Sequence, residues 1–198
     1  EQWVQEYDEL HFSNRQVIFE AGSSPNSFYW LTEGIVQLQS EPSPGRVFIR
    51  DLQQAPISLG LSALLAAKPQ TESAISMTKG KMRVIPIGDF ANFLQDKPSV
   101  MQYIIQQIAS ETLAQQALQS EYSFASVRKR VALSLCRIYD IFGDQEIDFP
   151  REALASFSAV SRGGLMRVLA EFREDSLVET ENTKLKVTSH QALTQITD

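Results

Sequence analysis

Residues 149–173 read FPREALASFSAVSRGGLMRVLAEFR, and this segment decides the predicted fold. Pro150 suits the first turn of a helix, where a missing N–H costs nothing. Further along, four apolar residues recur at the i, i+3, i+4 and i+7 spacing of one helix face: Leu165, Val168, Leu169 and Phe172. Pro150, with Leu154 and Phe157 on one face, predicts one helix near Arg151–Ser158, and the four-residue spacing predicts a second helix, with a buried stripe, near Ser161–Arg173.

The face opposite this stripe carries arginines close to the start of the second helix. Ser161 is a candidate N-cap, and Arg162 and Arg167 would point outward with Met166 between them. Two helices with a short connection and basic residues on the second are typical of a helix-turn-helix. An arginine fork can bind O6 and N7 of guanine or clamp a phosphate. Any helical hairpin with exposed arginines has the same pattern, so a purely structural role stays open.

The segments on either side extend this reading. Residues 177–179 and 185–187 are β-prone and flank the polar turn 181–183, which predicts a hairpin beside the two helices. Residues 99–142 contain no Gly or Pro, which predicts one long helix or two helices with a bend near 123–126. Residues 99–122 alone could extend about 35 Å as a helix, and a long helix with an apolar stripe packs on another element or on its twin.

The N-terminal half has a different pattern. From Gln16 to Ile87, short β-prone runs alternate with turn formers, as in Val17–Phe19 followed by the turn 21–26. Strands this short and regularly spaced predict an antiparallel sandwich or barrel. A jelly-roll enzyme of the metal-dependent kind would need clustered His and carboxylate ligands inside the barrel. The sequence lacks such a cluster, so we expect no catalytic residues and no enzyme.

Composition excludes several classes of protein. Of 198 residues, 18 are basic and 24 acidic, a net charge of −6, and 43% are hydrophobic, as in ordinary globular proteins. The single cysteine, Cys136, excludes a disulfide framework and a four-thiolate iron–sulfur cluster. With only His11 and His190, we expect no metal site and no haem. Residues 125–198 carry 10 basic and 11 acidic side chains, which supports nucleic-acid binding only weakly.

The sequence also points away from a membrane. It contains no run of about 20 apolar residues, the length that a membrane helix needs. The first six residues lack the basic and apolar regions of a secretory signal. We therefore expect a cytoplasmic protein without a membrane partner.

Three motifs together resemble the Crp/Fnr family of bacterial transcription regulators. They are Val17–Val36, Gly60–Leu65 and Leu154–Leu169, and their order and spacing agree with the family from about residue 12 to 196. The resemblance implies an α+β fold with an N-terminal antiparallel β jelly roll, a long central dimerisation helix and a C-terminal winged helix-turn-helix. The implied domains are a cyclic-nucleotide-binding-like sensor over 1–97, the dimerisation helix over 98–124 and the DNA-binding domain over 125–198.

The same resemblance implies partners. It predicts a homodimer formed through residues 99–122, which binds a palindromic promoter site in double-stranded DNA. Two recognition helices would then enter successive major grooves about 34 Å apart. RNA polymerase is a further partner that the resemblance suggests.

The effector pocket departs from the family pattern. In cyclic-nucleotide-binding members, Gly-Glu holds the ribose and Arg-Ser/Thr-Ala holds the cyclic phosphate. The corresponding candidates here are Gly60, Leu61 and Ser62, followed by Glu72, Ser73 and Ala74. The side chain of Leu61 cannot accept a hydrogen bond from a ribose hydroxyl. The carboxylate of Glu72 would repel a phosphate about 4 Å away by roughly 1–4 kcal/mol. We expect cyclic AMP not to bind in the usual way, and the effector is not identified.

The recognition helix departs as well. The candidate DNA-binding residues are six: Ser161, Arg162, Gly163, Gly164, Met166 and Arg167. Family members commonly have Ser-Arg-Glu-Thr at the start of this helix, so Gly163 removes a base-reading side chain. Reading of bases is then left to Arg162 and Arg167, which we expect to have bare guanidinium groups, with Met166 against a thymine methyl. The alternative is a family member that has lost DNA binding and acts through protein contacts, which the two glycines and the net acidity favour.

Overall fold

The computed structural model describes residues 5–43 and 45–196. Residues 1–4, 44 and 197–198, which include the outer ends of the predicted first and last domains, lie outside the described part. The chain forms two compact units. The first consists of Glu1–Glu41 and Ile49–Gln115, and the second of Pro42–Phe48 and Gln116–Asp198.

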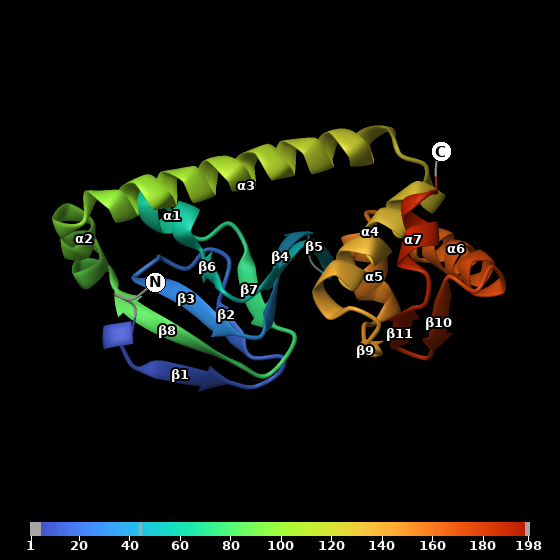
Figure 1. The fold of residues 1–198 in the computed structure, drawn as a ribbon, viewed down its shortest axis with the longest axis horizontal. Coiled ribbons are helices and arrows are strands. Elements are labelled where there is room, and N and C mark those ends of the chain that lie inside the picture. Colours follow the sequence, from blue (N-terminus) through green and yellow to red (C-terminus); the bar gives the residue numbers. More distant parts are fainter. Residues whose placement is uncertain (1–4, 44, 197–198) are drawn as a thin grey trace. The chain divides into compact units, whose positions relative to one another are not determined.

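The strands of the first unit form two four-stranded sheets (Figure 1). One sheet has the order β1-β8-β3-β6, and the other has the order β2-β7-β4-β5. The pairs β1–β8, β3–β8, β3–β6, β2–β7 and β4–β7 are antiparallel. The predicted antiparallel jelly roll is confirmed. The strand bounds are Glu9–Phe12 (β1), Val17–Phe19 (β2), Ser27–Glu33 (β3), Ile35–Ser43 (β4), Arg46–Gln54 (β5), Ile57–Leu59 (β6), Ser73–Ser76 (β7) and Gly80–Pro86 (β8).

Three of these strands carry no clear sequence pattern. Strands β1 and β6 lie at the two edges of their sheet and are only four and three residues long. Strand β7 has the sequence SAIS, whose small residues have weak strand preference. Its place between β2 and β4 comes from pairing with distant residues, which a local pattern does not contain.

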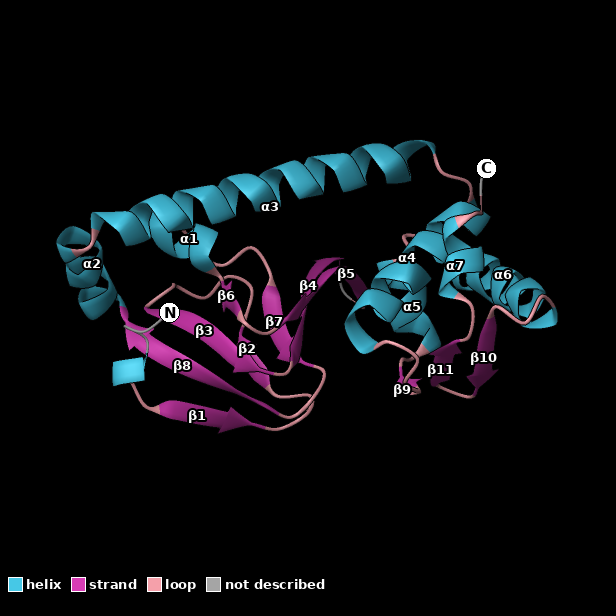
Figure 2. Cartoon of the chain, in the orientation of Figure 1, coloured by secondary structure: helices cyan, strands magenta, loops and turns pink. Residues whose placement is uncertain are grey.

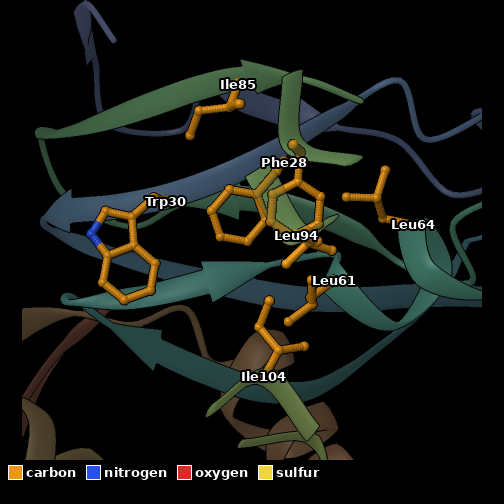
Figure 3. Packing of buried hydrophobic residues seen from close by; sticks show 8 residues of the cluster. Phe28, Trp30, Leu61, Leu64, Ile85, Leu94 and Ile104 are labelled. Carbon is orange, nitrogen blue, oxygen red and sulfur yellow. The ribbon is translucent and has the colours of Figure 1, made fainter. Parts of the chain in front are cut away.

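Three helices cover the sheet that contains β3 and β8: α1 (Leu61–Ala66), α2 (Ile87–Asp96) and the first part of α3 (Pro98–Phe124). They share one apolar cluster with that sheet (Figure 3). Its members are Phe28, Trp30, Leu61, Leu64, Ile85, Phe90, Leu94 and Ile104. Ile104 comes from α3, so burial of this cluster holds the long helix against β3, β8 and α1.

The second unit contains a helical core and a small sheet (Figure 2). Strands β10, β11 and β9 form an antiparallel sheet in that order. The hairpin β10–β11 is the predicted one, whereas β9 was not predicted because it has only two residues. The bounds are α4 (Val127–Phe142), β9 (Ile147–Asp148), α5 (Arg151–Phe157), α6 (Arg162–Glu174), β10 (Val178–Glu181), β11 (Lys184–Val187) and α7 (His190–Thr194).

Residues 99–142 form two helices rather than one. Helix α3 ends at Phe124 and α4 begins at Val127, so the predicted bend near 123–126 is a complete break. The hydroxyl of Ser126 accepts a hydrogen bond from the backbone N–H of Lys129 and caps α4. Among the residues that the structure describes, no helix has the length and apolar character required to cross a bilayer.

Candidate nucleic-acid interface and effector site

Helix α6 starts with a capping hydrogen bond. The side chain of Ser161 accepts a hydrogen bond from the backbone N–H of Gly164 at 3.1 Å. This bond satisfies one of the free donors of the first turn and fixes where the helix begins. The hydroxyl oxygen of Ser161, a candidate DNA contact, therefore already has a local structural role.

The predicted buried stripe orients α6. Leu165, Val168, Leu169 and Phe172 are all buried, together with Leu154 and Phe157 of α5. Because one face of α6 is packed in the core, the opposite face is turned outward. Met166 is 46% exposed on that face, and Arg162 and Arg167 are exposed beside it. The structure thus brings the three side chains expected to read bases onto one surface.

The two arginines differ in their contacts. Nη1 of Arg162 lies 2.8 Å from Oε1 of Glu152 on α5, and the two side chains are 70% and 65% exposed. The prediction of an unpaired guanidinium is therefore wrong for Arg162. The guanidinium of Arg167 makes no ion pair or hydrogen bond with any residue of 5–43 or 45–196. Exposed ion pairs contribute only about 0–1 kcal/mol, so the Arg162 pair can open at little cost.

The two glycines of α6 have different surroundings. A Cβ at Gly163 would meet no atom within 4 Å, so this position faces open space. A Cβ at Gly164 would lie 3.2 Å from Oγ of Ser161 and 3.3 Å from Cγ1 of Val127. The absence of a side chain at Gly164 thus allows close packing against the start of α4, whereas at Gly163 it only leaves the outer surface bare.

A contact that the sequence did not reveal holds the other end of α6. Arg128 of α4 pairs with Glu171 and places Nη2 3.2 Å from Oδ2 of Asp175. Its guanidinium carbon also lies 4.8 Å from the ring centre of Phe172. The i, i+4 spacing of the two acids is visible in the sequence, but their partner 43 residues away is not. These contacts join the C-terminal end of α6 to the start of α4.

In the first unit, the first half of the candidate effector site is occupied by the protein's own packing. Gly60 precedes α1 with a φ of 66°, a backbone conformation that favours glycine. Leu61 is 6% exposed and belongs to the apolar cluster, so its side chain is turned into the core. Gln70, which sequence reasoning missed, is buried and donates from Nε2 to the carbonyl of Gly60 at 3.4 Å. Only Ser62 is exposed.

The second half of this site is also paired internally. Nε of Arg50 donates to Oε1 of Glu72 at 2.6 Å, and Nη1 of Arg50 lies 3.8 Å from Oε1 of Glu111 on α3. Burial alone would lower the pKa of Arg50, but the hydrogen bond and the charge of Glu72 raise that pKa above its usual value. Ser73 accepts a hydrogen bond from the backbone N–H of Ala21, and Ala74 is fully buried.

No grouping of three or more His, Cys, Asp or Glu side chains suited to a metal ion occurs within residues 5–43 and 45–196. Cys136 lies partly buried on α4. Burial, with a smaller effect of Asp140, raises the pKa of its thiol to about 11. The thiol is therefore protonated and weakly nucleophilic at neutral pH.

Comparison with known proteins assigns both units. Residues 9–97 match the family of cyclic nucleotide-binding domains, and residues 129–196 match the Crp-like helix-turn-helix domains. The chain belongs to the Crp/Fnr family. This family consists of transcription regulators rather than enzymes, and a homodimer is its typical form.

Two kinds of relative support this assignment. The chain is 19% identical over 191 residues to a CRP-like cAMP-activated global transcriptional regulator of Mycobacterium tuberculosis, which covers 93% of this chain and 85% of the relative. The c-di-GMP-responsive regulator CLP of Xanthomonas campestris has a TM-score of 0.80 at 16% identity, covering 95% of this chain and 97% of CLP. A CRP/FNR-family regulator of Thermus thermophilus has a TM-score of 0.81 at 15% identity, with the same coverage. These structural likenesses establish the fold.

Proposed function

We propose that this Crp/Fnr regulator binds promoter DNA sequence-specifically through the exposed face of α6. The observation that carries the proposal is the orientation of α6. Its apolar stripe is buried, and Arg162, Met166 and Arg167 share the outer face. An arginine on such a face can donate two hydrogen bonds to a guanine in the major groove. In this proposal, residues 125–198 form the DNA-binding domain, with Ser161, Gly163 and Gly164 at the start of its recognition helix.

The decisive experiment is selection of bound duplexes from random DNA, followed by binding titrations with the selected site. We expect a palindrome whose half-sites are about one helical turn apart. Arg167→Ala should weaken binding to that site roughly ten- to hundred-fold, because each bidentate arginine–guanine pair contributes about 1–3 kcal/mol. Arg173→Ala, which removes an exposed arginine from the other end of α6, is the matched control. Equal binding by all three proteins would exclude reading of bases by Arg167.

We propose that residues 99–122, within the predicted dimerisation helix 98–124, form the homodimer interface. Large apolar side chains are exposed along this helix: Tyr103, Ile105 and Leu113. Leu113 is 66% exposed, and several exposed apolar side chains on one helix support an interface with a second copy. Leu113→Glu should shift sedimentation equilibrium toward the monomer, whereas Gln116→Glu, which adds the same charge at an exposed polar position, should not.

We further propose that the sensor domain, residues 1–97, does not take cyclic AMP in the way that the family pattern implies. The support is the internal pairing of Glu72 with Arg50 and the burial of Leu61. Of the relatives named above, the Mycobacterium tuberculosis regulator is cAMP-activated and CLP is c-di-GMP-responsive, so both nucleotides belong in the binding test. Isothermal titration that shows micromolar binding of cyclic AMP would contradict this proposal.

The remaining features of the proposal concern cofactors and partners. We expect purified protein to show no absorption bands of haem or of an iron–sulfur cluster, because one cysteine and two histidines provide few ligands. As a promoter-bound regulator the protein would act in the cytoplasm, with RNA polymerase as a candidate partner. The alternative function is that of a family member acting through protein contacts alone, which the Arg162–Glu152 pair and the bare surface at Gly163 favour. Failure to select any DNA would support that alternative.

A further inference from the structure

Glu152 is an acidic residue placed on the surface that is proposed to meet a polyanion. It lies in the first turn of α5, is 65% exposed, and pairs with Arg162, the first residue of α6. DNA carries one negative charge per about 1.7 Å of helix axis, so a carboxylate at this place opposes binding. Glu152 is nevertheless not an isolated surface charge, because it forms an ion pair with a candidate base-reading side chain.

We propose that Glu152 is a specificity-determining residue that positions the Arg162 fork for a guanine edge and weakens contacts to phosphate alone. This inference rests on the proposed DNA-binding function. The carboxylate contacts Nη1 of Arg162, so the donors on Nη2 and Nε stay available. A guanidinium held on one side loses less conformational freedom when it forms two bonds to O6 and N7 of guanine.

The same carboxylate acts differently on non-specific binding. A contact between Arg162 and a phosphate depends on charge, and the charge of Arg162 is largely cancelled by Glu152 at 2.8 Å. The pair therefore releases few counterions when it meets a random sequence. In the specific complex, the positioning effect offsets the repulsion. In the non-specific complex, only the repulsion remains. Glu152 therefore increases the ratio between the affinity for the specific site and the affinity for random DNA.

The test measures dissociation constants for the selected duplex and for a scrambled duplex of equal length. Glu152→Gln should tighten binding of the scrambled duplex about five- to ten-fold for a dimer near 0.1 M salt, and change the selected duplex less than about two-fold. The ratio of the two constants should fall about five-fold. The salt dependence for scrambled DNA should steepen by about one to two units of log–log slope, because each protomer gains one effective cation.

Two controls separate positioning from net charge. Glu174→Gln removes the same charge at the last residue of α6, about 18 Å from Arg162 along the helix axis, beyond the Debye length. It should leave the ratio within two-fold. In an Arg162→Ala background, Glu152→Gln should shift both duplexes by the same factor, because no fork remains to be positioned. Thermal unfolding of each variant verifies that it is folded.

Several results would overturn the inference. They are an unchanged ratio in Glu152→Gln, an equal fall in Glu174→Gln, or a fall of the same size without Arg162. Each of these requires that the unmodified protein binds DNA, so each contradicts the role of Glu152 while leaving the proposed function standing. If the unmodified protein binds neither duplex at low salt, the proposed function itself is contradicted, and the role of Glu152 with it.

Discussion

In the first unit, the carboxylate of Glu72 lies 2.6 Å from Arg50, whereas in the second unit the guanidinium of Arg167 makes no ion pair or hydrogen bond with the described residues. Leu61 likewise is turned into the core, while Met166 is turned outward. Polar groups that are already paired inside a protein gain little from a new ligand. The candidate effector residues of the first unit therefore already have internal contacts, whereas the exposed face of α6 in the second unit leaves Met166 and Arg167 available for a partner.

The largest expected effect tests the orientation of α6, in which burial of one face turns the opposite face outward. Leu165→Ala should reduce the free energy of unfolding by about 2–5 kcal/mol, because Leu165 is fully buried and its truncation leaves a cavity. Urea unfolding measures this loss. Met166→Ala, one residue away on the exposed face, should change stability by less than about 0.5 kcal/mol. Similar effects of the two substitutions would contradict the orientation of α6.

A second experiment tests the internal pairing at the candidate effector site. Glu72→Ala leaves the guanidinium of Arg50, which is 27% exposed, without its hydrogen-bonded partner. We expect a loss of about 1–3 kcal/mol in the free energy of unfolding. Glu111→Ala removes the more distant and more exposed acid and should cost less. If Glu72→Ala is as stable as the unmodified protein, the Arg50–Glu72 pair does not contribute to the stability of this region.

The glycines of α6 sharpen the comparison within the second unit. Gly163→Ala should raise the free energy of unfolding by about 0.5–1 kcal/mol, because the helix gains propensity and the new Cβ meets no atom within 4 Å. Gly164→Ala should gain less or lose stability, since its Cβ would lie 3.2 Å from Ser161 and 3.3 Å from Val127. Equal gains at both positions would contradict close packing of α6 on the start of α4.

A separate prediction, outside both candidate sites, concerns Cys136. A thiol pKa of about 11 in the folded protein leaves roughly a hundred-fold less thiolate at pH 8 than the usual value of 9.0 would. Alkylation at pH 8 should therefore be about a hundred-fold slower in the folded protein than in urea. Because folding raises the pKa of this thiol, the free energy of unfolding is unaffected by its titration below pH 9. It then falls as the pH rises from 9 through 11. Rapid alkylation of the folded protein would contradict the burial of the thiol.

Local sequence patterns predicted the elements of both units well where one face of an element is buried. The apolar stripe from Leu165 to Phe172 has a period that only a helix can bury on one side. For residues 99–142 the sequence left one helix or two helices open, and the structure has two. Strand β7 could not be predicted, because its assignment depends on partners in β2 and β4.

The candidate site divides in the same way. The sequence by itself determined which residues of α6 face outward, because helical periodicity and burial of leucine depend on neighbours along the chain. Only the tertiary structure decided which charged residues of distant segments meet. It paired Arg162 with Glu152, Arg128 with Glu171, and Arg50 with Glu72. Ion pairs between distant residues depend on how the helices and strands pack, and the spacing of charges along a chain contains no record of that packing.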